Sequence, residues 1–139
     1  MRKTLLISLI GLLLMSSCAS GPIKKNKDGV TVKLQQESPT DTRLVRLSVL
    51  NEKIIRVSAT PDEKFADKES LVVVPQTKDV KFEVIESDST VTVATSCMSA
   101  SVNLSNGQVV FRDSIGKILA AEDPNGRSFK PIEVEGSKG

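Results

Sequence analysis

Residues 91–122, VTVATSCMSASVNLSNGQVVFRDSIGKILAAE, constrain the fold more than any other part of the chain. Between positions 98 and 105, methionine, alanine, valine and leucine alternate with serine and asparagine. A period of two is that of a β-strand with one buried face, since successive side chains point to opposite sides of a sheet. The segment therefore predicts antiparallel strands with a core face and a solvent face, and it carries no pattern of catalytic side chains.

A first tight turn is expected at Asn106-Gly107, because both central residues of a type I′ turn need a positive φ, which asparagine and glycine tolerate best. A two-residue turn also fixes the register, since a slip by one residue would move every apolar side chain to the other face. The predicted pairs are Ser105 with Gln108, Leu104 with Val109, and Val102 with Phe111.

A second turn is expected over residues 113–116, DSIG. Asp113 and Gly116 occupy the first and fourth positions of a type I turn, the usual opening of a hairpin with a bulge. Residues 117–122 would then form the returning strand.

Further short apolar runs precede this segment, at residues 30–34, 44–49, 54–59, 71–74 and 80–85. The second and third of these form a hairpin around Asn51-Glu52-Lys53, and Phe82 and Phe111 are expected in the core. Residues 61–70 read as a charged loop in which a single helical turn remains open. Eight or nine short strands at spacings of about 8 to 12 residues predict an all-β fold, and we favour an antiparallel β-sandwich, here incomplete, over a barrel.

The N-terminus has the pattern of a secretory leader. Residues 1–17 hold two cations and then an apolar stretch that is too short to span a bilayer, so we expect a signal helix. The sequence LMSSC ends in Cys18 and resembles the lipobox of bacterial lipoproteins, in which that cysteine is acylated; an ordinary cleavage site with a chance cysteine is the alternative. We expect a lipoprotein anchored to a membrane of the bacterial cell envelope, periplasmic or outer-membrane. Residues 18–28 would be a flexible tether and residues 29–139 the sandwich.

Composition excludes several classes of function. The chain has no histidine, tryptophan or tyrosine, so histidine bases, histidine metal sites and most aromatic platforms for sugars or bases are ruled out. Removal of the leader would take away two of the 19 basic residues and none of the 17 acidic ones, and a neutral chain gives no sign of nucleic-acid binding. Cys97 would remain as a small structural thiol. We expect no catalytic residue, metal or cofactor.

The order of the segments is similar to that of the N-terminal domain of glycoside hydrolase family 31, the α-glucosidases and α-xylosidases. The resemblance runs through VRLSVLNEKIIRVSATP, FEVIES, residues 91–123 and FKPIEVEG, and rests mostly on Ile55-Arg56-Val57, Val93-Ala94-Thr95 and the strand and turn of residues 110–116. It implies a galactose-mutarotase-like sandwich. The family's activity is retaining hydrolysis of α-glycosidic bonds, and its catalytic aspartates lie on a (β/α)₈ barrel that follows this domain, so no catalytic residue carries over.

The resemblance implies a non-catalytic domain, in a truncated or split chain, that packs on a catalytic barrel absent from this sequence. An α-linked oligosaccharide would be bound only by the complete enzyme. The alternative is a stand-alone periplasmic lipoprotein that binds a partner protein through its sheet edges. An independent sugar-binding module is disfavoured, since the chain lacks tryptophan and tyrosine.

Overall fold

A computed structural model describes residues 21–66, 80–134 and 136–138. These residues contain β-strands and irregular segments, with no helix among them. The strands are β1 (Ile23–Asn26), β2 (Gly29–Lys33), β3 (Leu44–Asn51), β4 (Ile54–Thr60), β5 (Glu83–Glu86), β6 (Thr90–Ala94), β7 (Met98–Asn103), β8 (Val109–Asp113), β9 (Ile118–Ala121), β10 (Glu133–Val134) and β11 (Ser137–Lys138).

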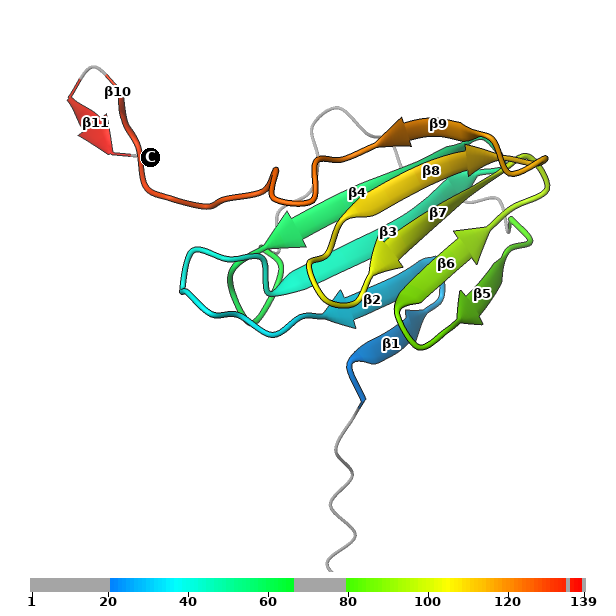
Figure 1. Cartoon of the computed structure of the whole chain (residues 1–139), viewed down its shortest axis with the longest axis horizontal. Coiled ribbons are helices and arrows are strands. Elements are labelled where there is room, and N and C mark those ends of the chain that lie inside the picture. The colour runs from blue at the N-terminus through cyan, green and yellow to red at the C-terminus, as the bar shows by residue number, and fades with distance from the viewer. Residues whose placement is uncertain (1–20, 67–79, 135, 139) are drawn as a thin grey trace, which may run out of the picture.

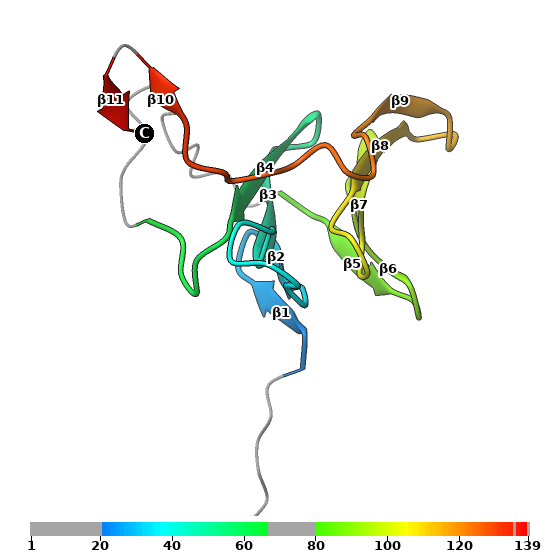
Figure 2. The same ribbon diagram turned by 60° about the vertical axis from the view of Figure 1, so that its left-hand side comes forward.

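The strands form two antiparallel layers (Figure 1). The first sheet has the order β1-β2-β3-β4 and the second the order β5-β6-β7-β8-β9, so each strand pairs with its neighbours in the sequence. Figure 2 shows the sheets face to face, with a C-terminal arm that crosses from the second sheet to the first and ends in the small hairpin β10-β11. The prediction of an all-β, antiparallel sandwich is confirmed.

The core lies between the two sheets and consists almost entirely of aliphatic side chains. It follows from the alternation in each strand, because every second residue faces the opposite sheet. Phe82 and Phe111, which were expected in the core, are only partly buried and pack against it. The buried residues are Val30, Val32, Leu34, Val45, Leu47, Val49, Ile55, Val91, Val93, Ala100, Val102 and Val109.

The flexible tether expected over residues 18–28 is wrong from Ile23 onward. Ile23–Asn26 is a strand, β1, that pairs antiparallel with β2 from Ile23↔Val32 to Asn26↔Gly29. Ile23 packs against the core, and Asn26 Nδ2 donates a hydrogen bond of 2.8 Å to Thr31 Oγ1. A segment with one apolar residue among lysines reads as a linker, yet it forms an edge strand because β2 offers it a hydrogen-bonding edge.

The register predicted for β7 and β8 is also wrong, by two residues. Val102 pairs with Val109 and Ala100 with Phe111, so the loop between the strands is longer than two residues. The Leu104 amide donates a hydrogen bond of 2.8 Å to the carbonyl oxygen of Ser89, which lies in the turn before β6. This amide is therefore not available to pair with β8. A shift of two residues keeps every side chain on its predicted face, and Ala100 and Val102 are fully buried.

Several other expectations can be compared with the structure. The hairpin around Asn51-Glu52-Lys53 is present as β3 and β4, with a register shift between Val49 and Asn51. The strand predicted over residues 80–85 is shorter and later, since β5 spans Glu83–Glu86. Residues 61–66 are irregular, without a helical turn. The strand expected at residues 71–74 and the remainder of the 61–70 loop lie outside the described residues.

Candidate functional site

The residues singled out in the sequence fall at separate places in the fold. Cys18, the expected lipidation site, lies outside the described residues. Asp113 and Gly116 form the turn between β8 and β9, where the Gly116 amide donates to Asp113 O at 3.1 Å and Asp113 Oδ1 accepts from the Ile115 and Lys117 amides. Gly116 has a φ of +87° and open space around it. These hydrogen bonds are those of a structural turn.

Gly107 lies at a more crowded position. It has a φ of +75° and is buried, and its amide donates to Asn103 O at 2.8 Å. A Cβ placed on it would collide with Cδ1 of Leu34, which belongs to the first sheet's side of the core. Asn106 caps the same loop, since its Oδ1 accepts from the Gln108 amide at 3.0 Å. The β7-β8 loop therefore closes one end of the sandwich against the other sheet.

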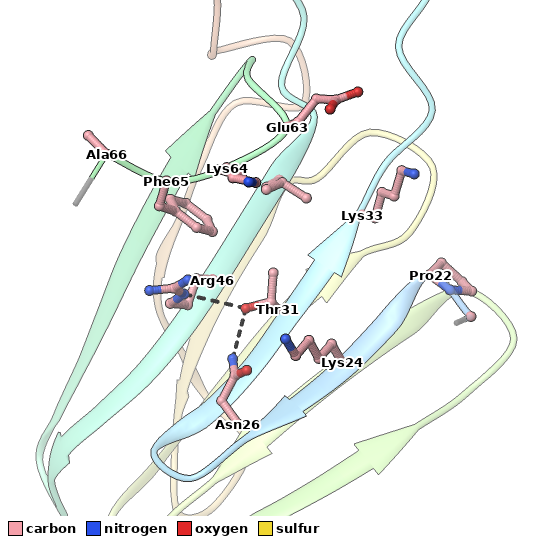
Figure 3. A pocket seen from close by; sticks show the side chains of 12 residues that line it. Pro22, Lys24, Asn26, Thr31, Lys33, Arg46, Glu63, Lys64, Phe65 and Ala66 are labelled. Atoms are coloured by element: carbon pink, nitrogen blue, oxygen red, sulfur yellow. Dashed lines mark hydrogen bonds between the residues drawn. The ribbon is translucent and has the colours of Figure 1, made fainter. Parts of the chain in front are cut away.

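The most site-like feature is a hollow of about 490 Å³ on the outer face of the first sheet, which we call the basic hollow (Figure 3). Antiparallel register places its residues side by side, because Lys24 of β1 faces Thr31 of β2, which faces Arg46 of β3. Phe65 and Lys64 border it from the segment after β4. Its cationic lining residues are Lys24, Lys33, Arg46 and Lys64, and its polar ones include Asn26 and Thr31.

Short contacts hold the floor of the basic hollow in place. Thr31 Oγ1 accepts hydrogen bonds from Asn26 Nδ2 at 2.8 Å and from Arg46 Nε at 3.4 Å, and the two dashed lines in Figure 3 mark this row. The Arg46 guanidinium carbon lies 4.2 Å from the centroid of the Phe65 ring, a cation–π contact. The arginine is therefore positioned by a hydroxyl on one side and an aromatic ring on the other.

Carboxylates are scarce in the basic hollow. Glu63 alone among its lining residues is acidic, and its Oε1 is 2.9 Å from Arg43 Nη2. A neighbouring open hollow at the end of the same sheet contains Glu37 and Asp62 as well as Glu63. All three of these side chains are exposed, which is typical of solvated surface charges. Retaining hydrolysis, in contrast, needs two carboxylates held about 5 Å apart around a bound sugar.

The described part of the chain contains no cluster of metal ligands and no disulfide that would indicate another site. There, no group of three or more histidine, cysteine, aspartate or glutamate side chains is arranged to hold a metal ion. Cys97 is a free, partly buried thiol in the turn between β6 and β7, where its amide donates to Thr95 Oγ1 at 3.3 Å. Within residues 21–66, 80–134 and 136–138, no helix is long and apolar enough to cross a membrane.

The second sheet ends in a strand, β9, whose apolar side chains are exposed. All four residues of β9 are exposed, including Ile118 at 56% and Leu119 at 57% of their surface. Ile115 of the preceding turn is more exposed still, and we call β9 with this turn the apolar edge. The C-terminal arm, which crosses to the first sheet, exposes Ile132 and Val134 separately (Figure 2). Exposed edge strands with apolar side chains are sites at which another part of a protein pairs or packs.

Polar contacts fix the first part of the C-terminal arm. Arg127 forms an ion pair with Glu122, whose Oε2 also accepts from the Val109 amide at 2.8 Å. Further on, the Phe129 amide donates to Thr40 O, beyond β2 of the first sheet, at 3.0 Å. The arm thus bridges the two layers rather than leaving the domain directly.

The two facing antiparallel sheets, each with its strands paired in sequence order, define a β-sandwich. Residues 44–137 match the family described as the glycosyl hydrolase 31 N-terminal galactose mutarotase-like domain. The chain belongs to this family, as the sequence resemblance implied. The match begins at β3, so the first two strands of the sandwich lie ahead of it.

Solved structures show the same relationship. The family 31 α-xylosidase from Xanthomonas citri is 41% identical and superposes with a TM-score of 0.71 over 83% of this chain. An uncharacterised protein and a cycloalternan-forming enzyme, both from Listeria monocytogenes, are each 20% identical with a TM-score of 0.56 over 73% of this chain, which shows a shared fold. This chain spans 12% of the xylosidase and 9% of each Listeria protein.

Proposed function

We propose that this chain is the non-catalytic N-terminal sandwich of an α-glycosidase of the α-xylosidase or α-glucosidase type, and that it packs on and supports a catalytic barrel. The observation that carries the proposal is the 41% identity to an α-xylosidase over 83% of the chain, combined with a span of 12% of that enzyme. An α-linked oligosaccharide would meet this domain only in the complete enzyme.

The apolar edge supports the packing part of the proposal. Ile118 and Leu119 expose more than half of their surface on the last strand of the second sheet, where a further layer of the same protein would remove them from water. The basic hollow is unsuited to that role, because its lysines would lose hydration against an apolar partner. The barrel is therefore expected on the β9 side of the sandwich.

An activity assay on the chain from Ala19 to Gly139 tests the non-catalytic role. We expect no hydrolysis of aryl α-xylosides or α-glucosides, because the acidic residues that line the two hollows described above are exposed surface charges and do not enclose a substrate. Light scattering on the same sample should show self-association through the apolar edge, reduced by Leu119→Lys, with Lys117→Glu as the control for a change of charge nearby. Turnover that disappears when one of the chain's own carboxylates is replaced would refute the proposal. A stable, inert monomer would favour the stand-alone lipoprotein.

We also propose that Cys18 is acylated and attaches the protein to a membrane of the cell envelope, as the sequence LMSSC suggests. One acyl chain gives marginal membrane binding, while the several chains of a lipoprotein give stable attachment. Cys18→Ala should abolish incorporation of labelled fatty acid and release the protein or block its maturation. Cys97→Ala, which removes the other cysteine, should leave the label unchanged. Absence of label from the wild-type protein would contradict this prediction.

A further inference from the structure

The four strands of the first sheet carry cations and no acidic residue at all. Their sequences are IKKN, GVTVK, LVRLSVLN and IIRVSAT. In contrast, the strands of the second sheet carry Glu83, Glu86 and Asp113 against one cation, Arg112. The positive charge is thus a property of one layer of the sandwich and not of the chain as a whole.

Strand alternation places almost all of this charge on the outer face. Val30, Val32, Val45 and Leu47 point into the core, so their neighbours Thr31, Lys33 and Arg46 point outward. Lys24 pairs with Thr31 and shares its face, and Arg56 pairs with Ser48 on the same side. Lys25 is the exception, because it pairs with Val30 and its Nζ lies 2.9 Å from Glu86 of the second sheet.

The hollow on this face has a lining whose charge suits an anion. Its lysines come from two strands and from the segment after β4, and Arg46 is held between Thr31 and the Phe65 ring. Glu63, the acid that lines it, is engaged by Arg43. A guanidinium that is fixed in position loses less freedom on binding a phosphate than a mobile one does.

Position in the chain indicates where the anions come from. Ile23, the first residue of β1, follows Cys18 closely in the sequence, and an extended chain covers at most about 3.6 Å per residue. If Cys18 carries the lipid anchor proposed above, β1 lies within about 18 Å of the acylated residue. Lys24 of β1 and Lys33 of β2 lie in the half of the sheet at which the chain enters it.

We propose that the outer face of the first sheet is a membrane-docking surface, which lays the sandwich on an anionic phospholipid bilayer with a lipid phosphate in the basic hollow. The proposal rests on acylation of Cys18. Basic side chains near an anionic bilayer are attracted to it over about one Debye length, roughly 8 to 10 Å. A connection of at most about 18 Å to the anchor allows the sandwich to lie against the bilayer, where these side chains come within that range. Docking would leave β9, the last strand of the second sheet, free for the rest of the protein.

Amine labelling of the lipidated full chain tests this arrangement. The protein is reconstituted into vesicles of phosphatidylcholine alone or of phosphatidylcholine with phosphatidylglycerol, and the labelling rate of each lysine is measured by mass spectrometry. We expect Lys24, Lys33 and Lys64 to be labelled several-fold more slowly on the anionic vesicles, and salt to remove the difference. Lys25, which neighbours Lys24 but faces the other sheet, should be labelled at the same rate on both.

Matched variants separate docking from general charge. Lys24→Gln with Lys33→Gln should abolish the protection of Lys64, whereas Lys81→Gln with Lys117→Gln, which remove the same charge from the second sheet's part of the chain, should preserve it. Equal labelling on both kinds of vesicle would overturn the proposal, as would protection by a soluble acidic oligosaccharide but not by anionic vesicles. If the protein floats with neither kind of vesicle, the acylation of Cys18 has failed, and the docking proposal that rests on it fails with it.

Discussion

Replacement of Gly107 with valine is expected to lower the free energy of unfolding by about 2 to 5 kcal/mol. Two physical costs combine at this position. A residue with a Cβ resists the φ of +75°, at about 1 to 2 kcal/mol, and the new side chain would collide with Leu34 in the core, where overpacking costs about 1 to 3 kcal/mol. Thermal or urea unfolding followed by circular dichroism measures the sum.

Gly116→Val serves as the matched control for Gly107→Val. Gly116 has a φ of +87°, but no other group lies within 4 Å of the place that a Cβ would occupy, so only the backbone cost applies and the expected loss is about 1 to 2 kcal/mol. Leu34→Ala combined with Gly107→Ala should be less destabilised than the sum of the two single variants, because the shortened leucine makes room for the new methyl group. If Gly107→Val unfolds at the wild-type temperature, the position of the β7-β8 loop against the first sheet is refuted.

Truncation of Leu47 to alanine is expected to destabilise the sandwich by about 2 to 5 kcal/mol. Leu47 lies in β3, an inner strand of the first sheet, where it pairs with Val30 and Val57 and is fully buried. Most of its buried neighbours are valines, which are short and stiff and cannot move far to fill the space. A cavity would therefore remain.

Ile118→Ala is the control for Leu47→Ala, because it removes a comparable aliphatic side chain from a strand position that is 56% exposed. We expect a change of about 0.5 kcal/mol or less, as for most surface substitutions. Denaturant unfolding of the two variants at one temperature gives the comparison. Equal losses at the two positions would mean that the core is not located between the sheets as described.

The strands could be predicted from the sequence because apolar and polar residues alternate along a strand whose sheet has one buried face. Ala100 and Val102 are buried and Ser101 is not, as the period of two requires. The register of β7 and β8 could not be predicted, because the competing partner of Leu104 is Ser89, a residue in another turn. The Asn106-Gly107 dipeptide indicates only the local backbone preference for a turn. The hydrogen bond from Leu104 to the loop that contains Ser89 determines where the β7-β8 hairpin closes.

The basic hollow was missed in the sequence for a related reason. Lys24 lies in a segment that reads as a tether, and Arg46 is a single cation within an apolar run. They meet because β1, β2 and β3 pair in a register that no local pattern specifies. The usable signal was the absence of aspartate and glutamate from residues 23–26, 29–33, 44–51 and 54–60. Family membership, in contrast, followed from the order of segments and needed no contact to be known.

The consecutive pairing of strands within each sheet has a consequence for synthesis. Strands that pair with their neighbours in the sequence need no distant partner, so the first sheet can form from residues 23–60 before the second sheet is available. Its apolar face, with Val30, Val32 and Leu47, then has no cover until β6 and β7 have been made. During that interval the nascent chain presents a nearly finished half-sandwich with its apolar face in water. Holding chaperones would be expected to bind the chain at this length and to release it once the second sheet, including Val109 of β8, has formed.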